Sequence, residues 1–244
     1  IGYDLHTPNV DVSEENPDEI FDAVLMTVKY IVRESGIAKE DIKFISLSAQ
    51  MHSLIVMNEN NQRLTENITW ADNRANDYAD LIEKSYGGFE LYQRTGIPIH
   101  PMSPLSKIFW MRHEEPKIFK QTAMFADLKT YVLFQLYERF VIDYSLGSAT
   151  GMMNLEQLDW DNKALELLGI ERNQLPQLVP TTHVLTGMKK RYATLMGIDE
   201  QTPVIVGASD GVLSNLGVNS YQKGEVAVTI GTSGAIRTVI NQPK

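Results

Sequence analysis

The sequence predicts an α/β fold, because short β-branched runs alternate with longer segments whose apolar residues recur at helical spacing. The clearest unit is the run 203–206, which stops at Gly207 and is followed by a new apolar segment from Val212. This order is typical of a buried strand, a tight turn and the first turn of a helix. It puts the carboxylate of Asp210 at the carboxyl end of a strand, where open α/β sheets bind their ligands.

The first part of the chain is expected to hold one long helix and several short strands. Asn16 and Pro17 favour a helix start, since asparagine caps helices and proline fits the first helical position. Gly36 is a suitable residue to end that helix. Strands are then expected at 42–48, 54–57 and 68–70, and a polar helix is expected at 74–84.

Prolines and glycines divide the rest of the chain. The segment 96–101 cannot be helical, because its two prolines hold the preceding residues extended. Asp143 is expected to cap an element that follows a strand ending at Ile142. Helices are expected at 104–113, 128–137 and 164–168, and an extended stretch at 175–180. The runs 225–229 and 235–240 flank a glycine-rich turn and predict a hairpin, which opens another domain after about Val218.

Composition narrows the function classes. A formal charge of −9 argues against nucleic acid or an anionic membrane as the main partner of these 244 residues. The absence of cysteine excludes disulfides and thiol nucleophiles and fits a cytoplasmic protein. No apolar run reaches the length of about 18 residues expected of a transmembrane helix, and the first residues do not resemble a signal peptide. The missing initiator methionine suggests that the chain begins partway into a domain.

Two turns together point to phosphoryl transfer to a hydroxyl. Asp210 offers a proton acceptor, and the turn of Gly231, Thr232, Ser233 and Gly234 offers backbone N–H groups and hydroxyls to an anion. Each also has a structural interpretation, Asp210 as a helix N-cap and the second turn as an ordinary hairpin turn. Neither the P-loop nor the dinucleotide-binding glycine pattern occurs.

The residues after the strand at 42–48 are expected to line the crevice at its end. These are Gln50, Met51 and His52. His52 is either a ligand donor or base, or a histidine satisfied by core backbone groups.

A second group, Trp70, Asp72 and Arg74, combines an aromatic ring, an acid and a cation, a mixture that suits sugars and polyols. The alternative is a packed Trp70, a capping Asp72 and a solvated Arg74. The same choice between binding and structural roles applies to a third group, His100, Met102, Ser103 and Lys107.

Other site chemistries find less support. No histidine or carboxylate spacing typical of a metal site occurs, so no residue is assigned to a metal. The sequence GASDG at 207–211 is close to the serine-hydrolase pattern but has Asp210 directly after Ser209. A hydrolase that uses Ser209 therefore remains an alternative, which needs a histidine and an acid in triad geometry.

Six motifs in order carry a family resemblance: SAQMHSL, ITWADNRA, GIPIHPMSPLSKIFW, DYSLGSATGMMN, VIVGASDGVLSNLGV and TIGTSGAIR. From about Pro17 to the C-terminus the chain resembles the FGGY family of carbohydrate kinases, and within it the gluconate kinase branch. The resemblance implies a ribonuclease-H-like fold, as in actin, hexokinase and Hsp70, with a mixed central sheet flanked by helices. It also implies a sugar-binding N-terminal domain at 1–218 and, at 219–244, the opening hairpin of an ATP-binding C-terminal domain.

The resemblance assigns roles to the candidate residues. Asp210 matches the catalytic base, and Gly231, Thr232 and Ser233 match a phosphate-binding turn. The sugar-contacting segments include Gln50, Met51, His52, Trp70 and Asp72, with Arg74, His100, Ser103 and Lys107 as further candidates. Arg74, Lys107, His52 and His100 are the cations that could bind a sugar-acid carboxylate.

The implied activity is that of a phosphotransferase with an alcohol acceptor, which uses ATP and Mg²⁺ to convert D-gluconate to 6-phosphogluconate. The family's first phosphate loop, of D-x-G-T-x-S type, does not occur before Ile1, so this chain alone is expected not to turn over ATP. The alternatives are a kinase for xylulose or another pentulose or polyol, a non-catalytic sugar-acid-binding fragment, and an actin-like filament or chaperone protein. The resemblance leaves a homodimer open.

Overall fold

A three-stranded mixed sheet, in the order β11–β12–β3, carries the candidate site. In this computed structural model, which describes residues 1–230 and 234–241, β3 (Ile45–Ala49) runs parallel to β12 (Val204–Ser209). The short β11 (Val184–Leu185) pairs with the other edge of β12 in the antiparallel direction. The predicted α/β fold with a mixed central sheet is confirmed.

Strand β12 continues past the glycine at which the sequence predicted a turn. Gly207 has a φ of +71°, and the pairing with β3 shifts register between Ile205 and Ala208. A Cβ at Gly207 would lie 1.9 Å from the carbonyl oxygen of Leu47, so the two backbones approach as closely as only glycine allows. The predicted turn at 207–211 is therefore wrong, because the glycine forms a bulge and the strand ends at Ser209.

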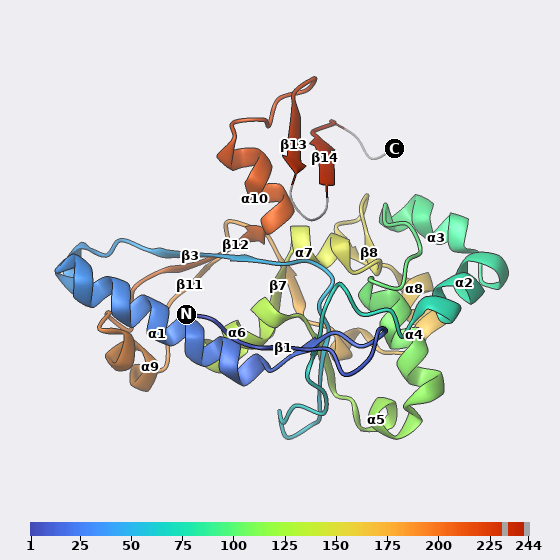
Figure 1. Cartoon of the computed structure of the whole chain (residues 1–244), viewed down its shortest axis with the longest axis horizontal. Helices are drawn as coiled ribbons and strands as arrows, with labels where there is room; N and C mark the ends of the chain where they lie inside the picture. The colour runs from blue at the N-terminus through green and yellow to red at the C-terminus, as the bar shows by residue number, and fades with distance from the viewer. Residues whose placement is uncertain (231–233, 242–244) are drawn as a thin grey trace.

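Two helices, α1 (Pro17–Ser35) and α6 (Leu128–Tyr137), pack with α9 (Lys190–Met196) around the apolar residues of this sheet. The start and end predicted for the first helix are confirmed, since the Asn16 side chain accepts from the N–H of Asp18 and Gly36 is left-handed. Figure 1 shows α1 lying along β3. Val204 and Val206 of β12 belong to this core.

A larger apolar cluster holds the middle of the chain together. Its helices are α2 (Asn76–Ser85), α3 (Gly88–Thr95), α4 (Pro104–Glu114), α5 (Pro116–Gln121) and α8 (Asn162–Leu168). The fully buried Leu105 and Ile108 of α4 lie in this cluster with Ile82 of α2. Helix α4 thus places Lys107 against two loops, the one that contains His52 and the one that contains Thr69.

Short strand pairs complete the fold. They are β4 (Ile55–Met57) with β6 (Met124–Ala126), β7 (Val141–Asp143) with β10 (Gln177–Val179), and β8 (Met153–Asn154) with β9 (Asp159–Trp160). A small three-stranded sheet has the order β1 (Leu5–His6), β2 (Glu14–Glu15), β5 (Asn67–Ile68). Asp143 caps α7 (Tyr144–Ala149), as predicted. Single 3₁₀ turns lie at Lys39–Asp41 and Arg172–Gln174.

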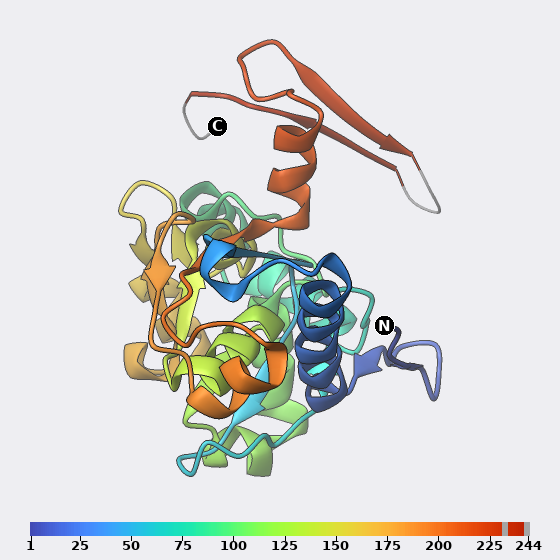
Figure 2. The same ribbon diagram turned by 90° about the vertical axis from the view of Figure 1, so that its left-hand side faces the viewer.

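The end of the chain projects from the rest and approaches it near Gly211. Helix α10 (Asp210–Gly217) leads to an antiparallel hairpin of β13 (Val226–Ile230) and β14 (Gly234–Thr238), which confirms the predicted hairpin. Figure 2 shows the hairpin projecting from the main body beside α10. Across the described ranges, the structure contains no helix that is long and apolar enough to cross a membrane.

Candidate active site

Ala49 and Ser209 are paired at the end of the parallel ladder between β3 and β12. Because parallel strands point the same way, the chain leaves both strands at the same edge of the sheet. Gln50, Met51 and His52 follow β3 there, and Asp210 follows β12. Two segments about 160 residues apart in the sequence are thereby brought to one edge, as the strand-end argument predicted.

Asp210 is the first residue of α10 and is exposed. The cap of this helix is Ser209, whose Oγ accepts from the N–H of Val212 at 3.4 Å, so the interpretation of Asp210 as the N-cap is wrong. The Asp210 carboxylate accepts the N–H of Gly211 at 2.7 Å. It remains open to a ligand and close enough to His52 for its charge to act on that imidazole.

His52 sits in the left-handed region, with a φ of +66°. Its Nδ1 is buried and has no hydrogen-bond partner among the described residues, so the interpretation of a histidine satisfied by core backbone groups is wrong for this nitrogen. Burial, together with the charge of Lys107, lowers the pKa of His52 to about 4, against the opposing effect of the Ala149 backbone. The imidazole is therefore neutral at pH 7.

Lys107 of α4 is buried, with 1% of its surface exposed. Its ammonium donates to the carbonyl oxygens of His52 and Thr69, both at 2.6 Å, and more weakly to that of Ile68 at 3.4 Å. Burial lowers the pKa of Lys107 to about 7, although the charge of Asp72 opposes the shift. Lys107 thus joins the loop after β3 to the loop after β5, and a contact with substrate would require these bonds to break.

Asp72 and Arg74 form a second internal network. The buried Asp72 accepts the N–H of Ser13 at 3.0 Å and pairs with the guanidinium of Arg74 at 2.9 Å. Arg74 also pairs with Glu14 at 2.5 Å and lies over the ring of Trp110, 5.0 Å from its centroid. Burial lowers the pKa of Arg74, but its bonds to Asp72 and Glu14 raise it overall. The interpretation of a solvated Arg74 is therefore wrong.

The other candidates on the sugar side differ in accessibility. Trp70 is 51% exposed, so the interpretation of a packed Trp70 is wrong. His100 is exposed, and its Nδ1 accepts the N–H of Met102 at 3.2 Å. Ser103 is buried as the N-cap of α4 and bonds to Ser106.

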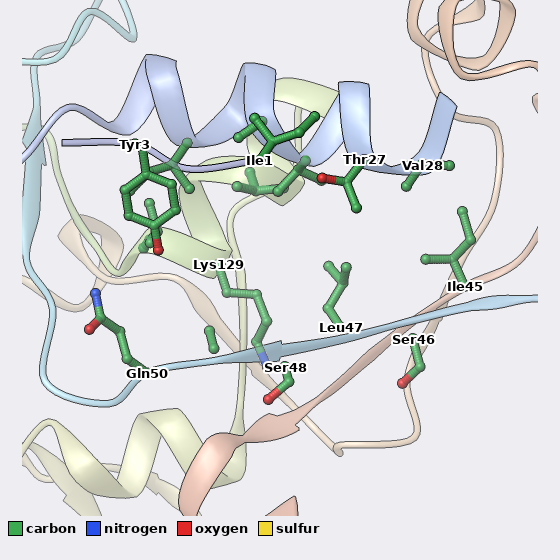
Figure 3. Close-up of a pocket in the computed structure, with 16 residues that line it drawn as sticks. Ile1, Tyr3, Thr27, Val28, Ile45, Ser46, Leu47, Ser48, Gln50 and Lys129 are labelled. Atoms are coloured by element: carbon green, nitrogen blue, oxygen red, sulfur yellow. The ribbon is translucent and has the colours of Figure 1, made fainter. Parts of the chain in front are cut away.

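Gln50 marks the boundary between the candidate site and a neighbouring cavity. It donates to the Glu15 carboxylate at 3.0 Å. A cavity of about 450 Å³ lies between α1 and β3, and of the nine sugar-side candidates only Gln50 lines it. Figure 3 shows this cavity, with Lys129 pointing toward Ser48 on its floor. The cavity is therefore a separate feature from the exposed edge that carries Asp210.

The structure adds one residue that the sequence argument missed. A Cβ at Gly211 would lie 3.0 Å from the Met51 methyl group and 3.3 Å from Nε of Arg237. Arg237 belongs to β14, and its guanidinium also donates to Thr229 at 3.2 Å. The loop after β3, the start of α10 and the hairpin therefore meet beside Asp210. No local pattern around Arg237 indicates this, because the approach depends on where the hairpin lies.

The expected phosphate-binding turn cannot be placed. Gly231, Thr232 and Ser233 lie outside the described residues. Within the described ranges, no group of three or more histidine or acidic residues could hold a metal ion. These described residues therefore form no protein cage for Mg²⁺, an ion that often binds through one or two carboxylates together with substrate phosphates.

Ser209 is not a nucleophile. Its surface is 0% exposed, and its hydroxyl caps α10. A hydrolytic serine must present its Oγ to a substrate and to a histidine base. The serine-hydrolase alternative is thus contradicted.

The chain is similar to known proteins in both sequence and structure. The model of the N-terminal domain of the FGGY family of carbohydrate kinases matches residues 1–217. The gluconokinase of Bacillus subtilis (strain 168) is 52% identical over all 244 residues, which cover 47% of its length. The xylulose kinase of the same organism is 28% identical over 234 residues, 96% of this chain and 47% of that protein.

Among solved structures, that of the gluconate kinase from Lactobacillus acidophilus superposes with a TM-score of 0.96 at 38% identity, covering 100% of this chain and 49% of that one. The chain spans about half the length of the curated relatives it matches.

Proposed function

Because the chain belongs to the FGGY family of carbohydrate kinases, we propose that this protein transfers the γ-phosphoryl group of ATP to the primary hydroxyl of D-gluconate, giving 6-phosphogluconate. The observation that carries the proposal is the register of β3 and β12, which brings the 50–52 loop and Asp210 to one edge of the sheet. The identity of 52% to a gluconokinase, against 28% to a xylulose kinase, supports gluconate as the acceptor.

We assign the general base to Asp210. Its exposed carboxylate accepts the proton of the substrate hydroxyl as the new O–P bond forms and the bond to ADP breaks. General-base help is typically worth a factor of about 10² to 10⁴ in rate. The alternative interpretation, a cap that stabilises the helix, is weakened because Ser209 already provides that cap.

Gluconate presents a row of hydroxyls, and we assign their binding to the residues that follow β3, β5 and the 96–101 segment. The exposed ring of Trp70 offers an apolar surface to the C–H groups of the substrate. The neutral imidazole of His52 offers one donor and one acceptor to hydroxyls. Gln50, Met51 and His100 complete the proposed sugar side, each partly or fully accessible.

We propose Arg237 as the cation for the gluconate carboxylate. Of the earlier candidates, Arg74 is paired with two carboxylates and Lys107 is bonded to backbone carbonyls. His52 carries no charge at pH 7, and His100 uses its Nδ1 to accept the N–H of Met102. Arg237 lies against Gly211, one residue from Asp210. The gluconate carboxylate is at the opposite end of the six-carbon chain from the primary hydroxyl, so the long arginine side chain would extend along the substrate to bind it through paired hydrogen bonds.

The buried candidates are given a supporting role in the proposal. Lys107 holds the loops that carry His52 and Trp70. Asp72 and Arg74 hold the loop with Trp70 against β2 and the residue before it. Ser103 caps the helix on which Lys107 lies. These residues shape the site and do not contact the substrate.

For the nucleotide we propose ATP with Mg²⁺, and Gly231, Thr232 and Ser233 as the turn that binds phosphate. We further propose that residues 1–218 form the sugar-binding domain and that 219–244 open the ATP-binding domain. The projection of the hairpin from the main body in Figure 2 and the end of α10 at Gly217 support this division. Bound Mg²⁺ would offset the charge of the phosphate oxygens.

A substrate panel on the complete protein tests the proposal. ADP release is measured with gluconate, xylulose, glycerol and no acceptor, at equal ATP and Mg²⁺. We expect kcat/KM to be highest with gluconate by at least ten-fold. A higher value with xylulose would instead support the pentulose alternative, and saturable gluconate binding without ADP release would support a non-catalytic binding protein.

A further inference from the structure

A buried ion pair joins α6 to the end of β7. Nζ of Lys129, in α6, is 2.6 Å from Oδ2 of Asp143, at the end of β7. Lys129 is 3% exposed and Asp143 is 0% exposed. Removing two charges from water is costly, and the pair is weak evidence for stability as such. The structure therefore prompts the question of what this pair holds in place.

The other oxygen of the Asp143 carboxylate organises the start of α7. Oδ1 of Asp143 accepts the N–H of Ser145 at 3.0 Å and the N–H of Leu146 at 3.3 Å. It also accepts the hydroxyl of Ser145. Because this hydroxyl donates to Asp143, its oxygen is turned toward donors that approach from the other side.

That donor is the backbone of the strand next to the proposed base. The N–H of Ser209 donates to Oγ of Ser145 at 2.8 Å. Ser145 lies in α7, which follows β7, and β7 pairs with β10 and not with β12. This hydrogen bond therefore joins α7 to a strand of another sheet. A continuous path thus runs from Lys129 through Asp143 and Ser145 to the residue that precedes Asp210.

The hydrogen bond between Ser145 and Ser209 lies at the irregular end of β12. The register shift at Gly207 interrupts the ladder just before Ser209, and the pairing ends at Ser209 itself. Ser209 must then adopt the extended conformation that caps α10, with φ −67° and ψ 154°. Fixing its N–H fixes the direction in which the next residue leaves the strand. A displacement of 1 Å at a reacting group can cost about 10² in rate.

We propose that Ser145, oriented by the Asp143–Lys129 pair, is a positioning residue that sets the orientation of the Asp210 carboxylate. The inference rests on the proposed function, because it assumes that Asp210 is the base. Ser145 acts through the Ser209 N–H, 2.8 Å away. The same network explains why a buried ion pair is retained where an apolar pair would fill the space.

The test compares Ser145→Ala with Ser148→Ala in the complete protein. Ser148 lies on the same helix, and its hydroxyl bonds within α7, to the carbonyl oxygen of Ser145 at 2.9 Å. We expect Ser145→Ala to lower kcat with gluconate at least ten-fold and to change KM less than two-fold. Ser148→Ala should keep kcat within two-fold, and Ser145→Thr, which retains the hydroxyl, should recover most of the loss.

A second readout is independent of turnover. The Ser209 amide should exchange its hydrogen at least ten-fold faster in Ser145→Ala than in Ser148→Ala, while the amides of Val204 and Val206 exchange at unchanged rates. Equal exchange in the two variants, or faster exchange with unchanged kcat, would overturn the positioning role. If the unmodified protein phosphorylates no acceptor, the proposed function fails instead, and the exchange rates still decide whether Ser145 holds Ser209.

Discussion

Ser209 lies opposite Ala49 in the last pair of the β3–β12 ladder. The pairing is parallel, so His52 and Asp210 follow their strands on the same side of the molecule. The contact of the Met51 methyl group with Gly211 shows how closely the loop after β3 approaches the start of α10. The chemistry proposed for this protein depends on that junction, and the predictions below test its parts.

Gly207→Ala should break the junction. The new Cβ would meet the Leu47 carbonyl oxygen at 1.9 Å in a left-handed backbone, so we expect a loss of about 3 kcal/mol or more in the free energy of unfolding. Gly187→Ala is the matched control, since Gly187 has a φ of +75° but open space around it, and it should cost only about 1 kcal/mol. Urea unfolding of both variants checks this, and equal losses would contradict the close approach.

Lys107→Met should loosen the two loops beside the site. Methionine fills the space but cannot donate, so the carbonyl oxygens of His52 and Thr69 lose their charged partner. We expect a loss of about 2–4 kcal/mol in the free energy of unfolding and a higher KM for gluconate. Lys163→Met, at an exposed lysine, should change the unfolding free energy by less than about 0.5 kcal/mol. Similar unfolding curves for the two variants would show that the hydrogen bonds of Lys107 to the two loops do not stabilise the fold.

His52 should make the protein less stable in acid. Its pKa is about 4 when folded and about 6.5 when unfolded, so the unfolded chain binds more protons between these values. Stability from this group is complete above pH 6.5 and falls as the pH decreases toward 4. Between pH 7 and pH 5 the unmodified protein should lose up to about 2 kcal/mol more than His52→Gln does. Parallel losses in the two proteins would show that the imidazole titrates normally.

Arg237→Ala should weaken the binding of a charged acceptor and leave an uncharged acceptor unaffected. If the guanidinium binds the carboxylate, KM for gluconate should rise about 10- to 100-fold, while kcat/KM for xylulose stays within three-fold. Arg33→Ala, at an exposed arginine of α1, serves as the control and should leave both values unchanged. An equal effect on both acceptors would place Arg237 outside the carboxylate site.

Much of the fold could be predicted because its signals are local. Helix α6 spans 128–137 as expected from its dense apolar residues, and α1 begins and ends at the predicted cap residues. Helices α3, α5 and α9 were missed, and none of them begins with a side-chain cap. The strand at 42–48 begins later than expected, because residues 39–41 form a 3₁₀ turn.

The sequence could predict only the part of the candidate site that depends on where strands end. The shared edge follows from two strands that end in polar residues, but the partners of Lys107 come from loops 38 to 55 residues away. The contact of Arg237 with Gly211 and the bond from Ser209 to Ser145 likewise join distant segments. Neither the spacing of apolar residues nor a local motif predicts such contacts, because they form only when distant segments pack together.

The most direct test of the account is the turnover of Asp210→Asn in the complete protein, with gluconate and ATP. The substitution keeps the size of the side chain and removes the proton acceptor, so kcat should fall by a factor of about 10² to 10⁴ while gluconate binding by calorimetry stays within three-fold. Asp77→Asn, an exposed acid in the first turn of α2, should retain normal turnover. An Asp210→Asn enzyme as active as the Asp77→Asn enzyme would contradict the role of Asp210 as base.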